Sequence, residues 1–540
     1  MKKTLLLCWI YPAVIFGQVN FQSSNLPIVI ISTNGQSIPD EPKITAQMKV
    51  IDNGIGQSNH INDAPNGYDG FIGIERRGST SQDLSDKKPY AVETRDANGN
   101  NLNVELLGMP AENDWAFLAP FNDKSLVRDA FTLEMARRIM PWASRTRFVE
   151  LVLNGSYEGI YLVTERIKRD KNRVNIANLT ATDLSGDDLT GGYIIKMDKS
   201  TGSQTGGWTS PYPPQPGAWQ NTDYHFHFPK PSDIQPAQRQ YIRTWMTDFE
   251  NLMASPDFAD SANGYPKYLD VQSFVDFVII NELTKNVDAY RLSTFFHKDK
   301  DSKDERLHAG PVWDFNIAMG NANYCNGETY TGWAIDFNNH CPNDGWVIHF
   351  WWRTLWNDPS FRQRLHSRWK ELRGDLLATT HVTSMVDSLT GVVSQAQVRN
   401  WQRWPVLHTW VWPNAFCCGT YQQHVDYLKN WLVHRLEWMD GKMATLNAED
   451  YSPSRYFKTL VFPNPTDGAL TFKYYVRRGD QVRLRVYDAA GKLLAHIQTP
   501  TPPANGENQY TWEHDLPSGF YFYTVSVNGR VESDGKFVTR

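Results

Sequence analysis

The hydrophobic positions follow two different periods along the chain. From Ile28 to Gly108, short apolar runs alternate with polar residues and are separated by turn residues, which predicts β-strands. FVELVLNGSYEGIYLVTERI alternates on both sides of Asn154-Gly155, a dipeptide that favours a hairpin turn. From Ile234 to Met439 the pattern is mainly helical. It predicts an α+β fold with a β-rich lobe at about 20–200 and a helical lobe at about 234–450, within a domain spanning 18–450.

One helix is expected inside the β-rich part, from Lys124 to Met140. Its apolar stripe runs at four-residue steps from Val127 to Ile139, Asp123 is placed to cap it, and Pro141 stops it. The segment Ser200–Gly217 is rich in Gly, Pro, Ser and Thr, and it predicts a flexible or inserted loop.

The texture changes near Tyr451 to Lys458, where the helical pattern ends. Short alternating segments with turn residues between them follow, as in RLRVYDAAGKLLAHI and LPSGFYFYTVSVNGRV. This pattern predicts a small C-terminal β-sandwich domain at 459–540.

The first residues predict export. Two lysines precede an apolar run from Leu5 to Phe16 and then the small residue Gly17, which is typical of a signal peptide at 1–17 that directs passage through the inner membrane. The run is too short to span a membrane, and no longer apolar segment follows, so no transmembrane segment is expected. The formal net charge is −5 without a block of Lys and Arg, which argues against a nucleic-acid partner.

Four cysteines follow the predicted signal peptide, and an exported chain permits disulfides between them. Cys325 and Cys341 bracket one loop, so this pair is favoured. The adjacent Cys417 and Cys418 could form a vicinal bridge or stay as thiols. A zinc site is disfavoured because no further ligands follow at a suitable spacing.

Aromatic residues are abundant, with 20 Trp, and they suit either core packing or a stacking surface. The segment 349–373 has Trp and Leu at helical spacing and predicts core packing. The tryptophans of 401–416 could instead line a cleft. The alternating histidines of HFHFP, from His225 to Pro229, predict a short strand, with a metal site as the alternative.

Two acids stand out as candidate chemistry. Asp314 lies between Trp313 and Phe315 in GPVWDFNIAMGN, and Asp288 follows a long apolar helix in NELTKNVDAYRLSTFF. Phosphoryl transfer needs one carboxylate near the attacking hydroxyl and another on Mg²⁺. Two carboxylates could also flank a glycosidic bond, which leaves a glycan-cleaving enzyme as an alternative.

Seven motifs, in order, resemble those of the spore coat protein H (CotH) family of atypical protein kinases. They are GIERRGSTSQ, KKPYAVETRD, AENDWAFLAPFNDKSLVRDAFTLEMARR, RFVELVLNGSYEGIYLVTERIKRDKNRVNI, TGGYIIKMD, FVDFVIINELTKNVDAYRLSTFFHKD and GPVWDFNIAMGN. The resemblance covers Gly70–Asn321 closely. The C-terminal motifs FPNPTDG, VYDAAGK, LPSGFYFYTV and GKFVTR resemble the type A sorting domain of the type IX secretion system of Bacteroidota.

The resemblance implies a two-lobed, protein-kinase-like fold that binds ATP with Mg²⁺, or with Mn²⁺ or Ca²⁺. It implies Asp288 as the group that accepts the hydroxyl proton, and Asp314 with Asn316 as metal ligands. Many relatives carry an acid where this chain has Asn316, which implies weaker metal binding. The implied phosphate contacts come from a loop at 76–82, through Arg77, Gly78, Ser79 and Ser81. Lys88, preferred over Lys87, is the implied strand lysine that pairs with phosphate oxygens, and Glu134 is the helix acid that orients it. Glu165 is the acid implied to lie near the adenine.

The expected function is that of an exported kinase. It would phosphorylate Ser and Thr hydroxyls of secreted or surface proteins, and the type IX secretion machinery would be its partner through the C-terminal domain, leaving it secreted or attached to the cell surface. A surface adhesin or binding module on a catalytically weak kinase-like fold is the alternative.

Overall fold

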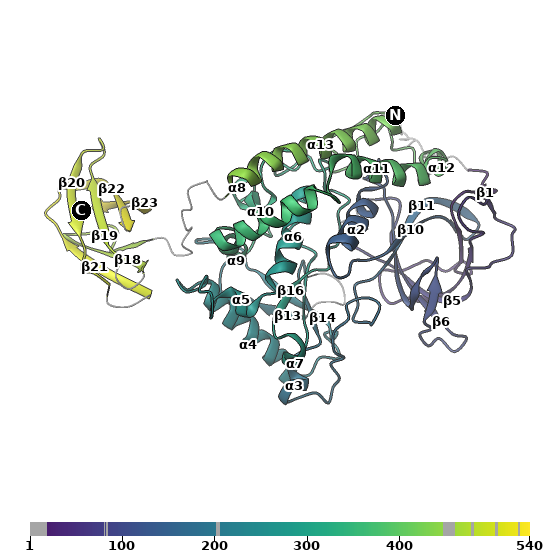
Figure 1. Ribbon diagram of the computed structural model, residues 1–540, viewed down its shortest axis with the longest axis horizontal. Helices are drawn as coiled ribbons and strands as arrows, with labels where there is room; N and C mark the ends of the chain where they lie inside the picture. The colour runs from purple at the N-terminus through teal and green to yellow at the C-terminus, as the bar shows by residue number, and fades with distance from the viewer. Residues whose placement is uncertain are drawn as a thin grey trace, which may run out of the picture. The chain divides into compact units, whose positions relative to one another are not determined.

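The computed structural model describes residues 19–79, 82, 85–200, 206–446, 459–476, 480–502, 506–527 and 530–540 (Figure 1). The predicted signal peptide, Ser81 and the residues 451–458 at the predicted domain break lie outside the described residues. Within the described part of the chain, no helix is long and apolar enough to cross a membrane.

The described residues form two compact units, each assembled from separate stretches of sequence. The first contains the residues up to Phe131 together with Arg145–Arg166 and Ser384–Leu428. The second contains Thr132–Ser144, Ile167–Thr383 and Lys429–Arg540. Helices and sheets occur together, as an α+β fold requires.

The first unit is built on a closed β-barrel whose strands alternate between the core and the outer face. In β3, ITAQMKVI buries Ala46, Met48 and Val50 and leaves Thr45, Gln47 and Lys49 outside. Successive side chains point to opposite faces of a strand, so this alternation fills the barrel. The barrel order is β10-β11-β9-β6-β5-β3-β2, with β10 and β2 paired in parallel to close it. The strands are β2 (Ile28–Ser32), β3 (Ile44–Ile51), β5 (Tyr68–Arg76), β6 (Tyr90–Arg95), β9 (Asp114–Leu118), β10 (Thr146–Leu153) and β11 (Ser156–Glu165).

The expected hairpin is present between β10 and β11. Asn154 and Gly155 both have positive φ, at 50° and 78°, as the turn that joins two twisted strands requires. Helix α12 (Ala396–Arg403) packs on β11, where the side chain of Asn400 accepts a hydrogen bond from Ile160 N at 3.1 Å. Gly159 has φ +85°, and a Cβ there would lie 2.5 Å from Asn400 Oδ1, so this close approach needs glycine.

The second unit contains a five-stranded sheet, in the order β13-β14-β12-β15-β16. The strands are β12 (Tyr193–Met197), β13 (Gly207–Thr209), β14 (Asp223–Phe228), β15 (Thr294–Lys298) and β16 (Leu307–Ala309). Helix α6 (Val271–Thr284) packs against β16 and α10 (Pro359–Arg373). Every residue of α6 except Gln272 is buried, as its apolar sequence predicts.

The described residues between 19 and 446 also form further helices and two short strand pairs. Trp351, Trp352 and Trp369 are buried, which confirms the core role expected for 349–373. These elements are α2 (Arg128–Ile139), α3 (Gly186–Leu189), α4 (Pro236–Met253), α5 (Tyr265–Tyr268), α7 (Asp301–Asp304), η2 (Ala334–Asp336), α8 (Phe337–His340), α9 (Phe350–Trp356), α11 (Thr379–Val393), α13 (Tyr421–Thr445), β1 (Ser23–Ser24) with β4 (Asn59–His60), and β7 (Val104–Leu106) with β8 (Met109–Glu112).

Two sequence predictions need correction. Helix α2 begins at Arg128 rather than Lys124, because Asp123 accepts hydrogen bonds from the amides of Ser125 and Arg128 and so forms a turn before the helix. The segment 200–217, expected to be a loop, contributes β13 to the edge of the sheet, within the described stretch 206–217.

The C-terminal residues form the expected β-rich region. Two sheets, β17-β18-β21 and β20-β19-β22-β23, share one hydrophobic cluster that includes Phe472, Leu484 and Tyr523. The two sheets therefore pack face to face, as in a β-sandwich. The strands are β17 (Leu460–Phe462), β18 (Ala469–Val476), β19 (Val482–Tyr487), β20 (Leu493–Gln498), β21 (Gly506–Glu513), β22 (Gly519–Val527) and β23 (Arg530–Thr539).

Candidate functional site

Asp288 lies in a tight turn that follows α6. Lys285 ends the helix with a left-handed backbone, at φ 43°. The chain then turns, and the amide of Asp288 donates to Asn286 Oδ1 at 3.1 Å. Arg291 Nη2 donates to Asp288 Oδ1 at 2.8 Å, and 19% of the Asp288 side chain remains exposed. The carboxylate is thus fixed in direction but still reachable from solvent.

The surroundings of Asp288 raise the pKa of its carboxyl. Burial is the largest cause, and the charges of Asp198 and Asp344 act in the same direction, whereas Arg291 and Lys199 lower the pKa. A carboxylate whose pKa is raised toward neutral pH is a better proton acceptor than an ordinary one. Its environment therefore suits general-base chemistry.

Asp314 lies on an irregular loop after β16, and its side chain is exposed. Its φ is +70°, a conformation that is uncommon for residues other than glycine and that often marks functional sites. The loop is tied down on its far side, where Met319 N donates to Thr284 O at 2.7 Å. Asn321 Nδ2 donates to the carbonyl of Asn316 at 2.7 Å, so Asn321 closes a turn in this loop. The backbone thus presents Asp314 outward on a fixed loop.

The structure brings the two acid-bearing segments together through Asn286. Its Nδ2 donates to the carbonyl of Asp314 at 3.2 Å, while its Oδ1 accepts from the amide of Asp288. Asn286 is buried, so this link is shielded from competing water. Sequence reasoning missed it. The available signal was an amide residue directly after the end of a buried helix and two positions before the candidate base.

The pKa of Tyr324 also indicates that Asp288 and Asp314 lie near each other. This pKa is raised, first by burial and then by the negative charge of Asp288, with smaller contributions from Asp344 and Asp314. One phenol therefore lies within electrostatic reach of both candidate acids.

The oxygen donors on this loop fit a hard divalent cation. Asp314 offers an exposed carboxylate, and Asn316, two residues on, offers an amide oxygen, which are the ligand types that Mg²⁺, Mn²⁺ and Ca²⁺ prefer. An amide brings one negative charge fewer than a carboxylate, so this pair holds a cation less tightly than two acids would.

Lys88 lies against the loop expected to contact phosphates. Its Nζ donates to Gln82 O and to Ser85 O, both at 2.5 Å. Gly78 has φ +92°, and its carbonyl accepts from Gln82 Nε2 at 2.7 Å. Arg77 N donates to Pro89 O at 3.1 Å, and Ser79 O accepts from Gln82 N at 3.0 Å. Within one unit, the structure thus joins Lys88 to the Arg77–Ser79 turn.

Lys87, the neighbouring lysine, is committed to the core instead. Its Nζ donates to Ile160 O at 2.5 Å and to Asn400 Oδ1 at 2.8 Å, and only 1% of the residue is exposed. Burial lowers its pKa well below the usual value. Lys87 therefore links the barrel to α12, and Lys88 is the lysine that faces the loop.

The two glutamates expected near the nucleotide have arginine partners. Glu134 accepts from Arg137 Nη1 at 3.0 Å and from Arg138 Nη2 at 2.8 Å, which are the i,i+3 and i,i+4 pairs typical of a helix surface. Glu165 is fully buried at the end of β11 and accepts from the amide and guanidinium of Arg145. Their nucleotide roles stay predictions.

The cysteines pair as two disulfides. Cys325–Cys341 is the pair that the sequence favoured, and Cys417–Cys418 takes the vicinal alternative. Near the vicinal pair, Trp410 and Trp412 are exposed, whereas Trp401 and Trp404 are buried. The tryptophans of 401–416 therefore divide between core and surface.

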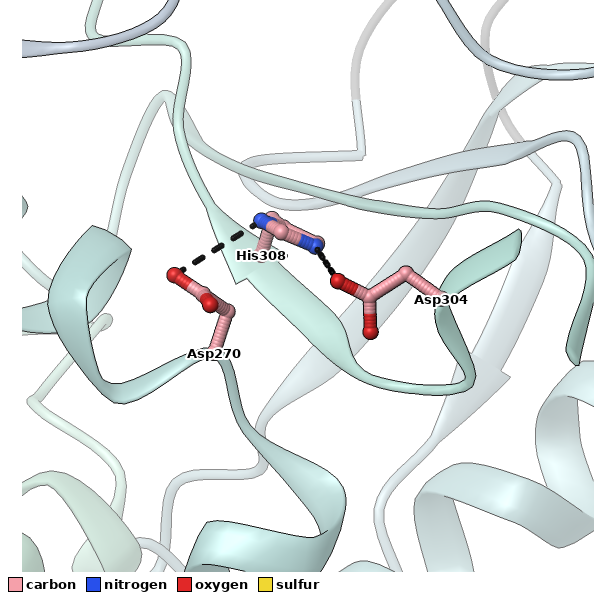
Figure 2. A group of neighbouring side chains, drawn as sticks. All are labelled: Asp270, Asp304 and His308. Atoms are coloured by element: carbon pink, nitrogen blue, oxygen red, sulfur yellow. Dashed lines mark hydrogen bonds and ion pairs between the residues drawn. The ribbon is translucent and has the colours of Figure 1, made fainter.

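Two other sets of polar side chains could be considered as metal sites. His225 and His227 lie on β14, as the strand prediction had it, and each Nε2 lies at hydrogen-bond distance from a backbone carbonyl. Asp270, Asp304 and His308 lie close together (Figure 2). Arg306, however, pairs with Asp304 at 2.7 Å and with Asp270 at 3.2 Å, and Asp270 also caps α6. The arginine already balances this cluster, which therefore has a structural explanation.

Two protein-family models match this chain. A family model described as CotH kinase protein matches residues 74–439, and one described as secretion system C-terminal sorting domain matches 460–540. No curated protein matches. A solved structure, the alkylpurine DNA glycosylase AlkC of Pseudomonas fluorescens bound to DNA with an abasic site analog, is 12% identical, with a TM-score of 0.13. That match covers 38% of this chain and 63% of the glycosylase, and it carries no argument about fold or function.

Proposed function

The chain belongs to the CotH kinase family and carries a type IX sorting domain, and from this premise we propose that it transfers phosphate from ATP to Ser or Thr hydroxyls of secreted or surface proteins. The observation that carries the proposal is the Asn286 link. It holds the turn of Asp288 and the loop of Asp314 to each other through one buried side chain. Phosphoryl transfer is mostly a matter of positioning and charge stabilisation, so two carboxylates on mutually fixed segments are what it requires.

Asp288 is proposed to accept the proton of the attacking hydroxyl. Its partial exposure gives an acceptor access, and its raised pKa makes it more basic than an ordinary aspartate. Arg291 leaves the second carboxylate oxygen, Oδ2, for the hydroxyl, because it donates to Oδ1.

Asp314 and Asn316 are proposed to hold Mg²⁺ or Mn²⁺. A cation bound there supplies neutralisation of the negative charge on the nucleotide phosphates. The left-handed backbone of Asp314 presents its carboxylate outward from an anchored loop.

Lys88, Arg77, Gly78 and Ser79 are proposed to contact the phosphates, and Glu165 to lie near the adenine. Backbone amides of a turn and an ammonium group both suit phosphate oxygens. The two-lobed, kinase-like fold and a nucleotide-binding role for Glu134 belong to the same proposal.

The sorting domain implies interaction with secretion machinery and a secreted or cell-surface location. A signal peptide at residues 1–17, a Bacteroidota origin and protein acceptors with Ser or Thr are the further parts of this proposal.

Labelled ATP tests the proposal. The purified chain is incubated with [γ-³²P]ATP and Mg²⁺ or Mn²⁺, alongside Asp288→Asn, Asp314→Asn and the matched control Asp375→Asn, which changes a carboxylate that the catalytic proposal does not use. We expect Asp288→Asn to bind ATP normally but to lose at least about 100-fold in transfer. Asp314→Asn should lose the metal dependence of ATP binding, and Asp375→Asn should behave as the parent. A parent that neither binds nucleotide nor incorporates label would refute the kinase proposal and favour a binding module.

A further inference from the structure

Arg291 is a buried arginine, and all three nitrogens of its guanidinium donate hydrogen bonds; Nε donates to Val287 O at 2.9 Å. It is 5% exposed, and its Nη2 bonds to Asp288. Its Nη1 donates to Asp344 Oδ1 at 3.2 Å and to Trp346 O at 3.0 Å. The plane of the guanidinium lies over the ring of Phe337, at 3.9 Å from its centroid. One side chain therefore joins the candidate base to a segment more than 40 residues later in the chain.

The Cys325–Cys341 bridge closes the first part of that segment, 325–346, and ends three residues before Asp344. The segment contains only the short helices η2 and α8, so much of its backbone depends on side chains for hydrogen bonds. Lys285 Nζ donates to the carbonyls of Asn326 and Thr331 at 2.7 and 2.6 Å. Gln220 Nε2 donates to Pro342 O and Asp344 O at 2.9 and 2.7 Å. The bridge thus joins the start of this segment to the residues just before Asp344.

We propose that Arg291 is the positioning residue for Asp288, and that the Cys325–Cys341 bridge holds Arg291 in place by fixing Phe337, Asp344 and Trp346. Phosphate transfer then requires the oxidised bridge. This inference rests on the proposed function, because it assigns a role within the same site.

The position of the segment supports this role. In protein kinases the segment that follows the metal-binding aspartate must be ordered before the site is competent. Here the segment follows Asp314, and a covalent bridge orders it. Two thiols form the bridge by passing two electrons and two protons to a disulfide oxidant, which becomes a dithiol. Because the cytosol keeps thiols reduced, the site becomes competent only after export.

The charged groups that face Asp288 set the direction of the pH effect. Arg291 and Lys199 favour its ionised form, and Asp198 and Asp344 oppose it. Tyr324 faces it as a neutral phenol with a raised pKa. Loss of the Arg291 contact removes the larger of the two favourable charges, so the acid limb of transfer moves to higher pH.

The test compares bridge and arginine variants in the full chain. The variants are Cys325→Ser with Cys341→Ser, Arg291→Lys and Arg291→Met, and the matched control is Cys417→Ser with Cys418→Ser. Each is measured for thermal unfolding, ATP affinity, the pH profile of kcat, and hydrogen exchange in peptides covering 286–296. Arg291→Lys keeps the charge but not the planar fork, so it tests positioning even if the bridge variant unfolds.

We expect the bridge variant to lose about 100-fold in kcat with ATP affinity unchanged, since a small misplacement of a catalytic group costs this much. Its acid limb should rise, and exchange at 286–296 should become faster. The Cys417 and Cys418 control should match the parent. A bridge variant or Arg291→Met with parental kcat, acid limb and exchange would overturn the inference. If the parent transfers no phosphate, the proposed function fails, and hydrogen exchange alone decides whether the bridge orders the Asp288 turn; unchanged exchange refutes that too.

Discussion

Arg435→Met gives the sharpest stability test, because Arg435 is fully buried on α13 and pairs there with the fully buried Glu282. Its guanidinium donates to the carbonyls of Glu282, Tyr330 and Gly332 at 2.5 to 2.9 Å and lies 3.4 Å from Glu282 Oε2. The Glu282 carboxylate also accepts from Tyr290 Oη and from the amides of Ala334 and Ile335. Removal of the arginine leaves the carbonyl and the carboxylate of Glu282 buried without it, and it also removes the donor to two part-buried carbonyls.

The expected cost follows from this contact set. Removal of one partner from a buried ion pair costs about 3–5 kcal/mol, because the other charge stays buried. Arg353→Met is the matched control, since Arg353 bonds to Ile335 O and Asp336 on the same segment with its side chain 30% exposed. Removal of an exposed pair of this kind costs about 1 kcal/mol or less.

The pH dependence separates a charge effect from simple loss of packing. Burial raises the pKa of Glu282, and Arg435 lowers it, so Arg435→Met raises that pKa further. A folded-state carboxyl with a raised pKa binds more protons than the unfolded state, so stability falls as pH rises through the interval between the two pKa values. The loss in Arg435→Met should therefore be larger at pH 8 than at pH 5.

Urea unfolding of the full chain at both pH values, followed by near-UV circular dichroism, measures these differences. Addition of Glu282→Gln to Arg435→Met should restore part of the loss at pH 8, because the stranded charge is removed. A loss no larger than that of Arg353→Met, or one that is independent of pH, would refute the reasoning.

Four further outcomes are expected. Burial lowers the pKa of His297 to about 4, so the unfolding free energy should fall by about 1–3 kcal/mol as pH drops from 6.5 to 4. His297→Asn should make the unfolding free energy, measured by urea titration, less dependent on pH; an unchanged pH dependence would contradict this. Lys88→Met should weaken ATP binding without loss of stability, whereas Lys87→Met should lower the free energy of unfolding by about 1–3 kcal/mol. Titration calorimetry with ATP and scanning calorimetry of both variants measure these effects, and the reverse pattern would exchange the roles of the two lysines. Asn316→Asp should lower the Mg²⁺ concentration needed for half-maximal transfer, and a higher requirement would remove Asn316 from the metal site. Deletion of 459–540 should leave the protein in the periplasm of a host with type IX secretion, and its appearance on the cell surface would contradict the sorting role.

Local signals in the sequence were enough for much of the fold. Strand-like sequence at 28–108 and on both sides of the turn predicted the barrel strands except β9, Asn154-Gly155 predicted the hairpin, and the spacing of Cys325 and Cys341 predicted their bridge. These features depend on neighbouring residues or on one short loop. The start of α2 was wrong because Asp123 bonds to two amides at once and forms a turn, which propensity alone does not distinguish from a helix cap.

The candidate site depends on contacts that span long stretches of chain. Asp288 and Asp314 were identified as residues, but the Asn286 link and the contact between Arg291 and Asp344 exist only after folding. Adjacent lysines raise the same difficulty. Lys87 enters the core because Asn400, over 300 residues later, supplies its acceptor, and no local pattern contains that information.

The most direct measurement follows the phosphate itself. The purified chain is incubated with ATP that carries ¹⁸O in its γ-phosphate, Mg²⁺ and a mixture of secreted proteins, and phosphopeptides are identified by mass spectrometry. The account predicts heavy phosphate esters on Ser or Thr in the parent reaction and their loss with Asp288→Asn at unchanged ATP binding. Absence of heavy phosphate in the parent despite bound ATP, or equal labelling by Asp288→Asn, would contradict it.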